Sequence, residues 1–215
     1  MNPHLEILPE AQKWLWPQLA EMEEGFVLYG GTAIALRFAH RQSVDFDFFG
    51  TAKFDPLQFR EKHRFLSETK VIQMEANTLT LHAPTPYGVV NVSIFGGLAM
   101  GRAGTPDVCP GNGVRLASPL DLAVQKLKVI QVRSEAKDYI DLDCLLDNGV
   151  ILEEAIGAAE SLYPGFPSLW ALKALCYHED GNISTIDNGI KARLKERAIQ
   201  FKGPVQMPRI SEALN

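Results

Sequence analysis

The chain has 215 residues, of which 46% are hydrophobic and 22% charged, and its formal net charge is -5. This composition is typical of a globular protein, and the length suits one domain or a small core extended by helices. The acidic balance excludes proteins that bind nucleic acid through bulk positive charge, although it leaves room for a local basic site.

Cysteine usage and hydropathy narrow the class of protein further. The three cysteines are far apart and form no CxxC pair, so the sequence indicates neither a disulfide framework nor a cysteine-based zinc site. No apolar run approaches the ~18 residues of a membrane helix, and the N-terminus lacks the basic and apolar regions of a signal peptide. We therefore expect a soluble, reduced, cytoplasmic protein without a membrane partner.

Residues 1–112 are predicted to form a small unit of strands and helices, which gives the whole chain an α+β fold. Turn signals and apolar spacing predict helices over 9–22, 32–39 and 54–66. Short apolar or alternating runs predict strands over 26–29, 43–49, 78–82 and 89–95. The stretch from 99 to 113 is rich in glycine and proline and is expected to be a loop or linker.

From residue 113 to the end, the chain is predicted to be helical. Ser118, Pro119 and Asp121 are a typical helix start: a serine cap, a proline at the first position and an acid three residues after the serine. This helix is expected to run to about Val132 or, if it is continuous, past Asp141. Three more helices are expected over 151–162, 166–178 and 188–201.

The clearest functional signal begins at Gly30 and Gly31, a glycine turn between a predicted strand and a predicted helix. A helix N-terminus after such a turn presents backbone N–H groups to which an anion such as a phosphate can bind. Glycine has no Cβ, so it permits the close approach that a phosphate needs. Thr32 is placed to cap the helix and to offer its hydroxyl to the same anion.

Asp45 and Asp47 lie two positions apart on a predicted strand, so their carboxylates leave the same face of it. Two adjacent carboxylates repel each other unless a cation lies between them, and such oxygen ligands favour Mg²⁺ or Mn²⁺. The polar face of an edge strand is the alternative for this pattern alone, but the upstream glycine turn favours a metal and phosphate site. A phosphatase-type motif is rejected, because it needs a hydrophobic strand just before it and residues 40–43 are polar.

A basic stripe is predicted on the helix that starts at Pro119. When ~100° per residue is counted from Leu120, Lys126, Arg133 and Lys137 fall on one side of the helix. The stripe indicates a surface for an anionic ligand when it is combined with the glycine turn and the two acids. By itself, a solvated helix end is the simpler interpretation.

Two acids, Asp138 and Asp141, return to the apolar side of the same helix if it is continuous. An unpaired buried charge is costly, so these acids need partners such as Arg133, Lys137 or Arg41. The alternative is an ordinary surface pair between Lys137 and Asp141.

Together these features resemble the AbiEii/AbiGii-type toxin nucleotidyltransferases, which belong to the polymerase-β-like nucleotidyltransferase superfamily. The resemblance covers roughly residues 28–146, and a weaker similarity continues over 170–180. The motifs that carry it are Gly30-Gly31-Thr32-Ala33, then His40-Arg41-x-Ser43-x-Asp45-x-Asp47-Phe48-Phe49, and then Asp121, Lys126, Arg133, Lys137-Asp138 and Asp141-Leu142.

The resemblance implies a mixed-sheet nucleotidyltransferase core over 1–112 and a helical region over 113–215 that completes the active-site cleft. It implies an enzyme that uses Mg²⁺ or Mn²⁺ to transfer a nucleoside monophosphate from an NTP to an acceptor hydroxyl. Some family members modify tRNA, and several are toxins paired with an antitoxin. An RNA acceptor and a cognate antitoxin are therefore expected partners.

The resemblance also assigns roles to single residues. Asp45 and Asp47 would hold the metal and, with Lys126 facing the nucleotide phosphates, form the catalytic set. The residues expected to bind or organise the nucleotide are Gly30, Gly31, Thr32, Arg41, Ser43, Lys126, Arg133, Lys137 and Asp138.

One departure from the superfamily template concerns its third carboxylate, which lies on a later strand and helps to hold a second metal. The polar face of the predicted strand over 89–95 offers Asn91 and Ser93 instead. A single-metal site, a substrate-supplied base and an impaired enzyme are therefore all open, with Glu75 as a candidate substitute. The alternative to an enzyme is a binding module that keeps the fold without the chemistry.

The remaining candidates have simpler interpretations. The five histidines do not cluster, which argues against a histidine metal site. Trp14, Trp16 and Trp170 are expected in the core rather than as base-stacking platforms. The basic run near the C-terminus is either a solvated face or a contact for RNA phosphates, and it comprises Lys191, Arg193, Lys195, Arg197 and Lys202.

Overall fold

The computed structural model describes residues 1–215, which fold into two compact units. The first unit comprises residues 1–101, 105–118 and 211–215, and the second comprises residues 102–104 and 119–210. The main break in the chain therefore falls at Ser118–Pro119 instead of the predicted boundary after residue 112. The reason is that residues 115–116 form a strand that pairs in parallel with residues 27–28 of the first unit.

A mixed sheet of seven strands, in the order β3-β4-β5-β2-β1-β7-β6, forms the first unit. Strand β2 is parallel to β5 and antiparallel to β1. The predicted α+β fold with a mixed sheet is confirmed, although the sequence predicted only the four central strands. The strands are β1 (Val27–Tyr29), β2 (Asp45–Phe49), β3 (Lys70–Glu75), β4 (Thr78–Thr85), β5 (Gly88–Phe95), β6 (Asp107–Val108) and β7 (Arg115–Leu116).

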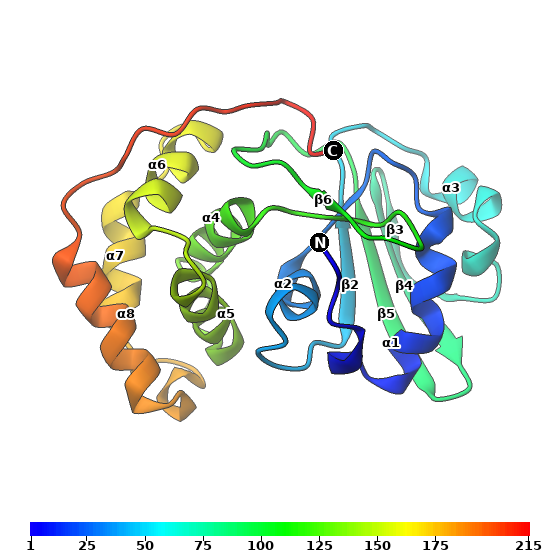
Figure 1. The fold of residues 1–215 in the computed structure, drawn as a ribbon. Coiled ribbons are helices and arrows are strands. Elements are labelled where there is room, and N and C mark those ends of the chain that lie inside the picture. The colour runs from blue at the N-terminus through cyan, green and yellow to red at the C-terminus, as the bar shows by residue number, and fades with distance from the viewer. The chain divides into compact units, whose positions relative to one another are not determined.

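One face of the central strands is apolar and buried. Phe46 and Phe48 of β2 are 0% exposed, as are Val92 and Ile94 of β5. Helix α1 packs against β4 and β5, and α2 packs against β1 and β2 (Figure 1). The helices of the first unit are α1 (Glu10–Leu15), α2 (Gly30–Phe38) and α3 (Pro56–Lys62), with short 3-10 helices over Leu5–Ile7, Trp16–Glu21 and Arg64–Leu66.

The first predicted helix, over 9–22, is α-helical only as far as Leu15 and continues as a 3-10 helix. Pro17 explains the change, because proline has no N–H to donate to the preceding turn. Trp16 is buried as predicted, but the core prediction is wrong for Trp14 and Trp170, which are 42% and 66% exposed.

The second unit is helical, as predicted, and its five α-helices are drawn from green to orange in Figure 1. The helix that starts at Pro119 ends at Val129 and is not continuous with the next one. Glu135 has an extended backbone, with φ -112° and ψ 124°, which a helix cannot pass through. The helices are α4 (Pro119–Val129), α5 (Ala136–Asp147), α6 (Leu152–Leu162), α7 (Ser168–Cys176) and α8 (Asn188–Gln200), with a 3-10 helix over Ile183–Thr185.

The helices of both units are too short or too polar to span a bilayer.

Candidate active site

The glycine turn lies between β1 and α2, and α2 begins at Gly30. Gly30 has φ +73°, a left-handed conformation that side chains other than glycine rarely adopt. A Cβ built at this position would lie 2.9 Å from Oδ2 of Asp47. Both the backbone conformation and the approach of the carboxylate therefore require glycine at residue 30.

Gly31 is covered by two polar side chains that the sequence also singled out. A Cβ on Gly31 would lie 2.5 Å from Nη2 of Arg41 and 2.9 Å from Oγ of Ser43. The Arg41 guanidinium also donates from Nη1 to the carbonyl oxygen of Gln42, at 2.8 Å. The structure thus places a cation and a hydroxyl directly over the backbone at the start of α2.

Thr32 does not cap α2, contrary to the prediction, because the helix begins two residues earlier and its N-cap position is Tyr29. The Thr32 side chain is buried, and its Oγ1 donates a hydrogen bond of 2.5 Å to the carbonyl oxygen of Asp45. Thr32 therefore joins the first turn of α2 to the strand that carries the acids. Its predicted contact with a phosphate stays a prediction.

Asp45 and Asp47 alternate along β2 with the fully buried Phe46 and Phe48, so both acids lie on the less buried face of the sheet. In the parallel pairing of β2 with β5, Asp45 lies beside Asn91 and Asp47 lies beside Ser93. Nδ2 of Asn91 donates a hydrogen bond of 2.8 Å to Oδ1 of Asp45. The neighbouring strand therefore supplies an amide and a hydroxyl next to the two carboxylates.

Glu75 does not substitute for the third carboxylate of the template on this sheet. It lies on β3, at the edge of the sheet, and β4 and β5 separate that strand from β2. His, Cys, Asp and Glu side chains do not gather in groups of three or more that suit a metal ion. The donors beside the glycine turn are the two β2 carboxylates, and their hard oxygen atoms fit Mg²⁺ or Mn²⁺.

In the second unit, Lys126 of α4 lies in a buried cluster of charges. Its Nζ is 2.8 Å from Oδ1 of Asp138 and 2.7 Å from Oδ2 of Asp141, both on α5. Nε of Arg133 donates to Oδ2 of Asp138 at 2.7 Å, and Nη2 of Arg133 donates to Oδ1 at 3.0 Å. The Lys126 side chain is 5% exposed and the two acids are 0% exposed, so the predicted need of these acids for basic partners is confirmed.

Asp138 is charged in spite of its burial. Desolvation raises the pKa of Asp138, but its hydrogen bond with Arg133 and the charge of Lys126 lower the pKa by more. The net result is a pKa below the ordinary aspartate value. Asp138 therefore remains an anion that holds Lys126 and Arg133 together.

The basic stripe predicted on one helix face does not form. Lys126 lies on α4, Arg133 lies between α4 and α5, and Lys137 lies on α5. Nζ of Lys137 is 2.9 Å from Oε2 of Glu135, so the alternative pair of Lys137 with Asp141 is not the contact observed either. The stripe was wrong because it assumed a continuous helix. The nucleotide-binding roles of Lys126, Arg133, Lys137 and Asp138 stay predictions.

Asp121 has a role that the sequence did not indicate. Besides its predicted place in the first turn of α4, its Oδ1 and Oδ2 accept hydrogen bonds from the backbone N–H groups of Ala103 and Gly104, at 2.8 and 3.0 Å. The carboxylate therefore binds a loop segment to the first turn of α4. Such a contact over 17 to 18 positions of sequence has no local signal.

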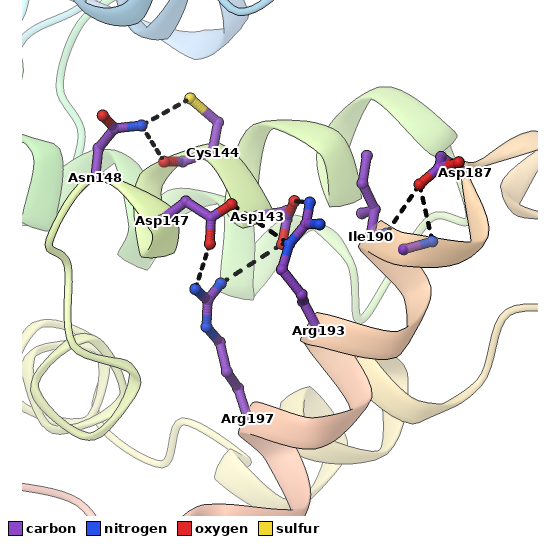
Figure 2. A network of polar contacts seen from close by, with 9 residues as sticks. Asp143, Cys144, Asp147, Asn148, Asp187, Ile190, Arg193 and Arg197 are labelled. Atoms are coloured by element: carbon purple, nitrogen blue, oxygen red, sulfur yellow. Dashed lines mark hydrogen bonds and ion pairs between the residues drawn. The ribbon is translucent and has the colours of Figure 1, made fainter.

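The basic C-terminal helix α8 is bound to α5 through its two arginines (Figure 2). Arg193 pairs with Asp143, and Nη2 of Arg197 is 2.5 Å from Oδ1 of Asp147. The Asp143 side chain is 5% exposed. The arginines thus hold the second unit together, and the more exposed basic residues Lys195 and Lys202 remain as candidates for contact with RNA.

Residues 18–164 match the protein family described as the nucleotidyl transferase AbiEii toxin of a Type IV TA (toxin–antitoxin) system. The match covers about two thirds of the chain and includes both the glycine-turn site and the Lys126 cluster. The chain belongs to the AbiEii nucleotidyltransferase toxin family. The resemblance inferred from the motifs is thereby confirmed.

Similar proteins fit this AbiEii assignment. An uncharacterized protein of Aquifex aeolicus (strain VF5) is 28% identical over 158 residues, which cover 72% of this chain and 74% of that protein. MenT4, a nucleotidyltransferase toxin from Mycobacterium tuberculosis H37Rv, has a similar structure, with a TM-score of 0.57 and 16% identity over 89% of this chain and 82% of MenT4. An antigenic nucleotidyltransferase-like protein from Paracoccidioides brasiliensis gives a TM-score of 0.51 and 17% identity over 91% and 95% of the two chains. These two structures show that the fold is that of nucleotidyltransferases.

Proposed function

We propose that this AbiEii-family protein transfers a nucleoside monophosphate from an NTP to an acceptor hydroxyl, with a divalent cation, Mg²⁺ or Mn²⁺, held by Asp45 and Asp47. One observation carries the proposal: Oδ2 of Asp47 reaches the backbone of Gly30, where α2 begins. Carboxylates that suit a cation and N–H groups that suit a phosphate therefore lie side by side. A nucleoside triphosphate with its bound cation needs this combination.

Each residue around Gly30 has its own role in the proposed site. The N–H groups at Gly30 and Gly31 would bind phosphate oxygens, and the Arg41 guanidinium above Gly31 would add a charged donor. Ser43 would contribute a hydroxyl. Thr32 would hold the first turn of α2 against β2 through its hydrogen bond to the Asp45 carbonyl oxygen. A bound cation would neutralise the charge on the phosphates, so that catalysis rests on positioning and electrostatic stabilisation.

Four residues of the second unit are part of the proposal through the family motif. Lys126 would bind the nucleotide phosphates. Asp138 would hold the side chains of Lys126 and Arg133 in place through its ion pairs with them. Arg133 and Lys137 have side chains that are 44% and 50% exposed, so these two cations are the more accessible to an anionic ligand.

The test is transfer of label from each of the four NTPs to total RNA in the presence of Mg²⁺. Asp45→Asn and Asp47→Asn should each reduce transfer by at least a hundredfold, because each removes a charged ligand of the cation without changing the side-chain shape. Glu75→Gln is the matched control, since it neutralises an exposed acid on the edge strand of the same sheet. Transfer that persists in both aspartate variants would show that the proposed site is wrong.

We further propose that the acceptor is RNA, with tRNA as the first candidate, and that a cognate antitoxin opposes the activity in the cytoplasm. Membership of a toxin family described as part of a Type IV TA system supports this proposal. Expression alone should arrest growth, and co-expression with the adjacent open reading frame should restore it. Expression of Asp45→Asn should leave growth unaffected.

A second candidate is a protein that binds nucleotide without transferring it. Asn91 and Ser93 favour this candidate, because they occupy the positions beside Asp45 and Asp47 where the superfamily template has an acid. Calorimetry that detects NTP binding, combined with no transfer to any acceptor, would support it. Any transfer that depends on Asp45 would exclude it.

A further inference from the structure

We infer that Asn91 is a positioning residue for Asp45 and that it makes the less buried face of the paired strands β2 and β5 a site for one divalent cation. The inference rests on the proposed function, because it assumes that the cation is bound by Asp45 and Asp47. Asn91 itself contributes no negative charge to the site.

The contact between Asn91 and Asp45 fixes the direction of one carboxylate. Nδ2 of Asn91 donates to Oδ1 of Asp45 at 2.8 Å, and the two residues are direct neighbours in the parallel pairing of β5 with β2. A hydrogen bond from a rigid strand limits rotation of the carboxylate, so Oδ2 of Asp45 is left for a ligand. On the other side, Gly30 lets Oδ2 of Asp47 approach the start of α2.

The charges at the paired positions of β2 and β5 match a single divalent cation. Asp45 and Asp47 contribute two negative charges, whereas Asn91 and Ser93 on β5 are neutral. An acid at residue 91 would bring a third carboxylate to within hydrogen-bond distance of Asp45, and that cluster would require more positive charge. The Asn91 amide instead brings a neutral hydrogen-bond donor to Asp45 and adds no further negative charge.

The test measures Mn²⁺ binding by calorimetry, with stoichiometry and dissociation constant as readouts and without turnover. The wild-type chain should bind one Mn²⁺, and Asp45→Asn together with Asp47→Asn should abolish binding. Asn91→Ala should weaken binding by about three- to tenfold, the effect of losing one exposed hydrogen bond to a charged group. Asn91→Asp should tighten binding by about tenfold or more, because a third carboxylate joins the site.

Gln73→Ala is a matched control, because Nε2 of Gln73 donates to Oε1 of Glu75 at 3.0 Å and thus forms the same kind of exposed amide–carboxylate bond on edge strand β3. It should leave the Mn²⁺ dissociation constant within twofold. Thermal unfolding without metal monitors folding: Asn91→Asp should lower the melting temperature, and saturating Mn²⁺ should raise it by more than in the wild type.

The outcomes separate this inference from the proposed function. Binding that depends on Asp45 and Asp47 but is unchanged in both Asn91 variants would overturn the role of Asn91 and leave the proposed function standing. Weaker binding in Asn91→Asp, or two ions per wild-type chain, would overturn it as well. Absence of any binding to the wild type would overturn both.

Discussion

At the scale of single residues, Gly30 links backbone conformation to the geometry of the acids. Its φ of +73° is left-handed, and a Cβ there would lie 2.9 Å from Oδ2 of Asp47. Gly113 has nearly the same φ, +72°, but a Cβ at Gly113 would have no atom within 4 Å. The chain thus offers two glycines with equal backbone strain, of which only one lies against a site residue.

Gly30→Ala and Gly113→Ala should therefore have similar effects on stability and different effects on function. Each should lower the free energy of unfolding by about 1–2 kcal/mol, the cost of a Cβ in the left-handed region. Only Gly30→Ala should also displace Asp47 and so weaken Mn²⁺ binding and nucleotide transfer. Urea unfolding and calorimetry on both variants check this, and equal loss of Mn²⁺ affinity in the two would contradict it.

The sequence predicted these residue-scale features where they depend on local pattern. Alternation with Phe46 and Phe48 placed Asp45 and Asp47 on one face of a strand, as observed. Sequence alone could not predict that Asn91 donates to Asp45, because strand pairing between residues 46 positions apart decides it. Nor could it predict that Thr32 donates to the Asp45 carbonyl oxygen rather than capping its own helix.

At the scale of elements, the pairing of α4 with α5 depends on the charge of Asp138. Its pKa lies below the ordinary aspartate value, so the folded state binds fewer protons than the unfolded state in this range. The stabilisation is therefore complete above the ordinary pKa of ~4 and is lost as the pH falls through the lower pKa of the folded state. Lys126 then loses one of its two carboxylate partners.

Asp138→Asn should lower the free energy of unfolding by about 3 kcal/mol at pH 7, because a buried pair loses one charge. The difference from the wild type should shrink between pH 5 and pH 3, since the variant has no carboxyl to titrate at residue 138. Urea unfolding over this pH range measures it. Glu135→Gln, which removes an exposed partner of Lys137, is the control and should change stability by less than about 0.5 kcal/mol. A pH-independent difference would contradict the assigned cause.

Elements with a strong periodic pattern were predicted and those without one were missed. The four central strands carry apolar or alternating residues, whereas β3 is exposed at nearly every position and β6 and β7 have two residues each. The end of α4 at Val129 has no glycine or proline to signal it. The sequence therefore leaves both an end near Val132 and a continuous helix open, and the basic stripe, which needs the continuous helix, is wrong.

At the scale of the whole molecule, the net charge of -5 averages over regions that neutralise each other. The acids of α5 and the arginines of α8 meet within the second unit, where Asp143 and Asp147 pair with Arg193 and Arg197 (Figure 2). Composition could show that an acidic segment and a basic segment exist. Only the packing of α8 on α5 shows which basic side chains form ion pairs within the second unit.

Because the two arginines of α8 are paired with acids of α5, we expect the lysines of the C-terminal segment to contact an RNA acceptor. Lys195→Gln combined with Lys202→Gln should reduce the dependence of RNA affinity on salt by about one to two units of slope, since each phosphate contact contributes about 0.7–0.9. The melting temperature should stay within a degree or two, because both side chains are exposed. Filter binding of total tRNA between 50 and 200 mM salt measures the slope.

Arg197→Gln is the matched control for the same helix, because its side chain is 28% exposed and its Nη2 pairs with Asp147. It should lower the melting temperature by weakening the contact between α8 and α5 while leaving the salt slope close to that of the wild type. The reverse result, a smaller slope in Arg197→Gln and an unchanged slope in the lysine variant, would show that the arginines leave their aspartate partners to bind RNA. The two variants therefore separate a helix that stabilises the unit from a helix that carries the acceptor surface.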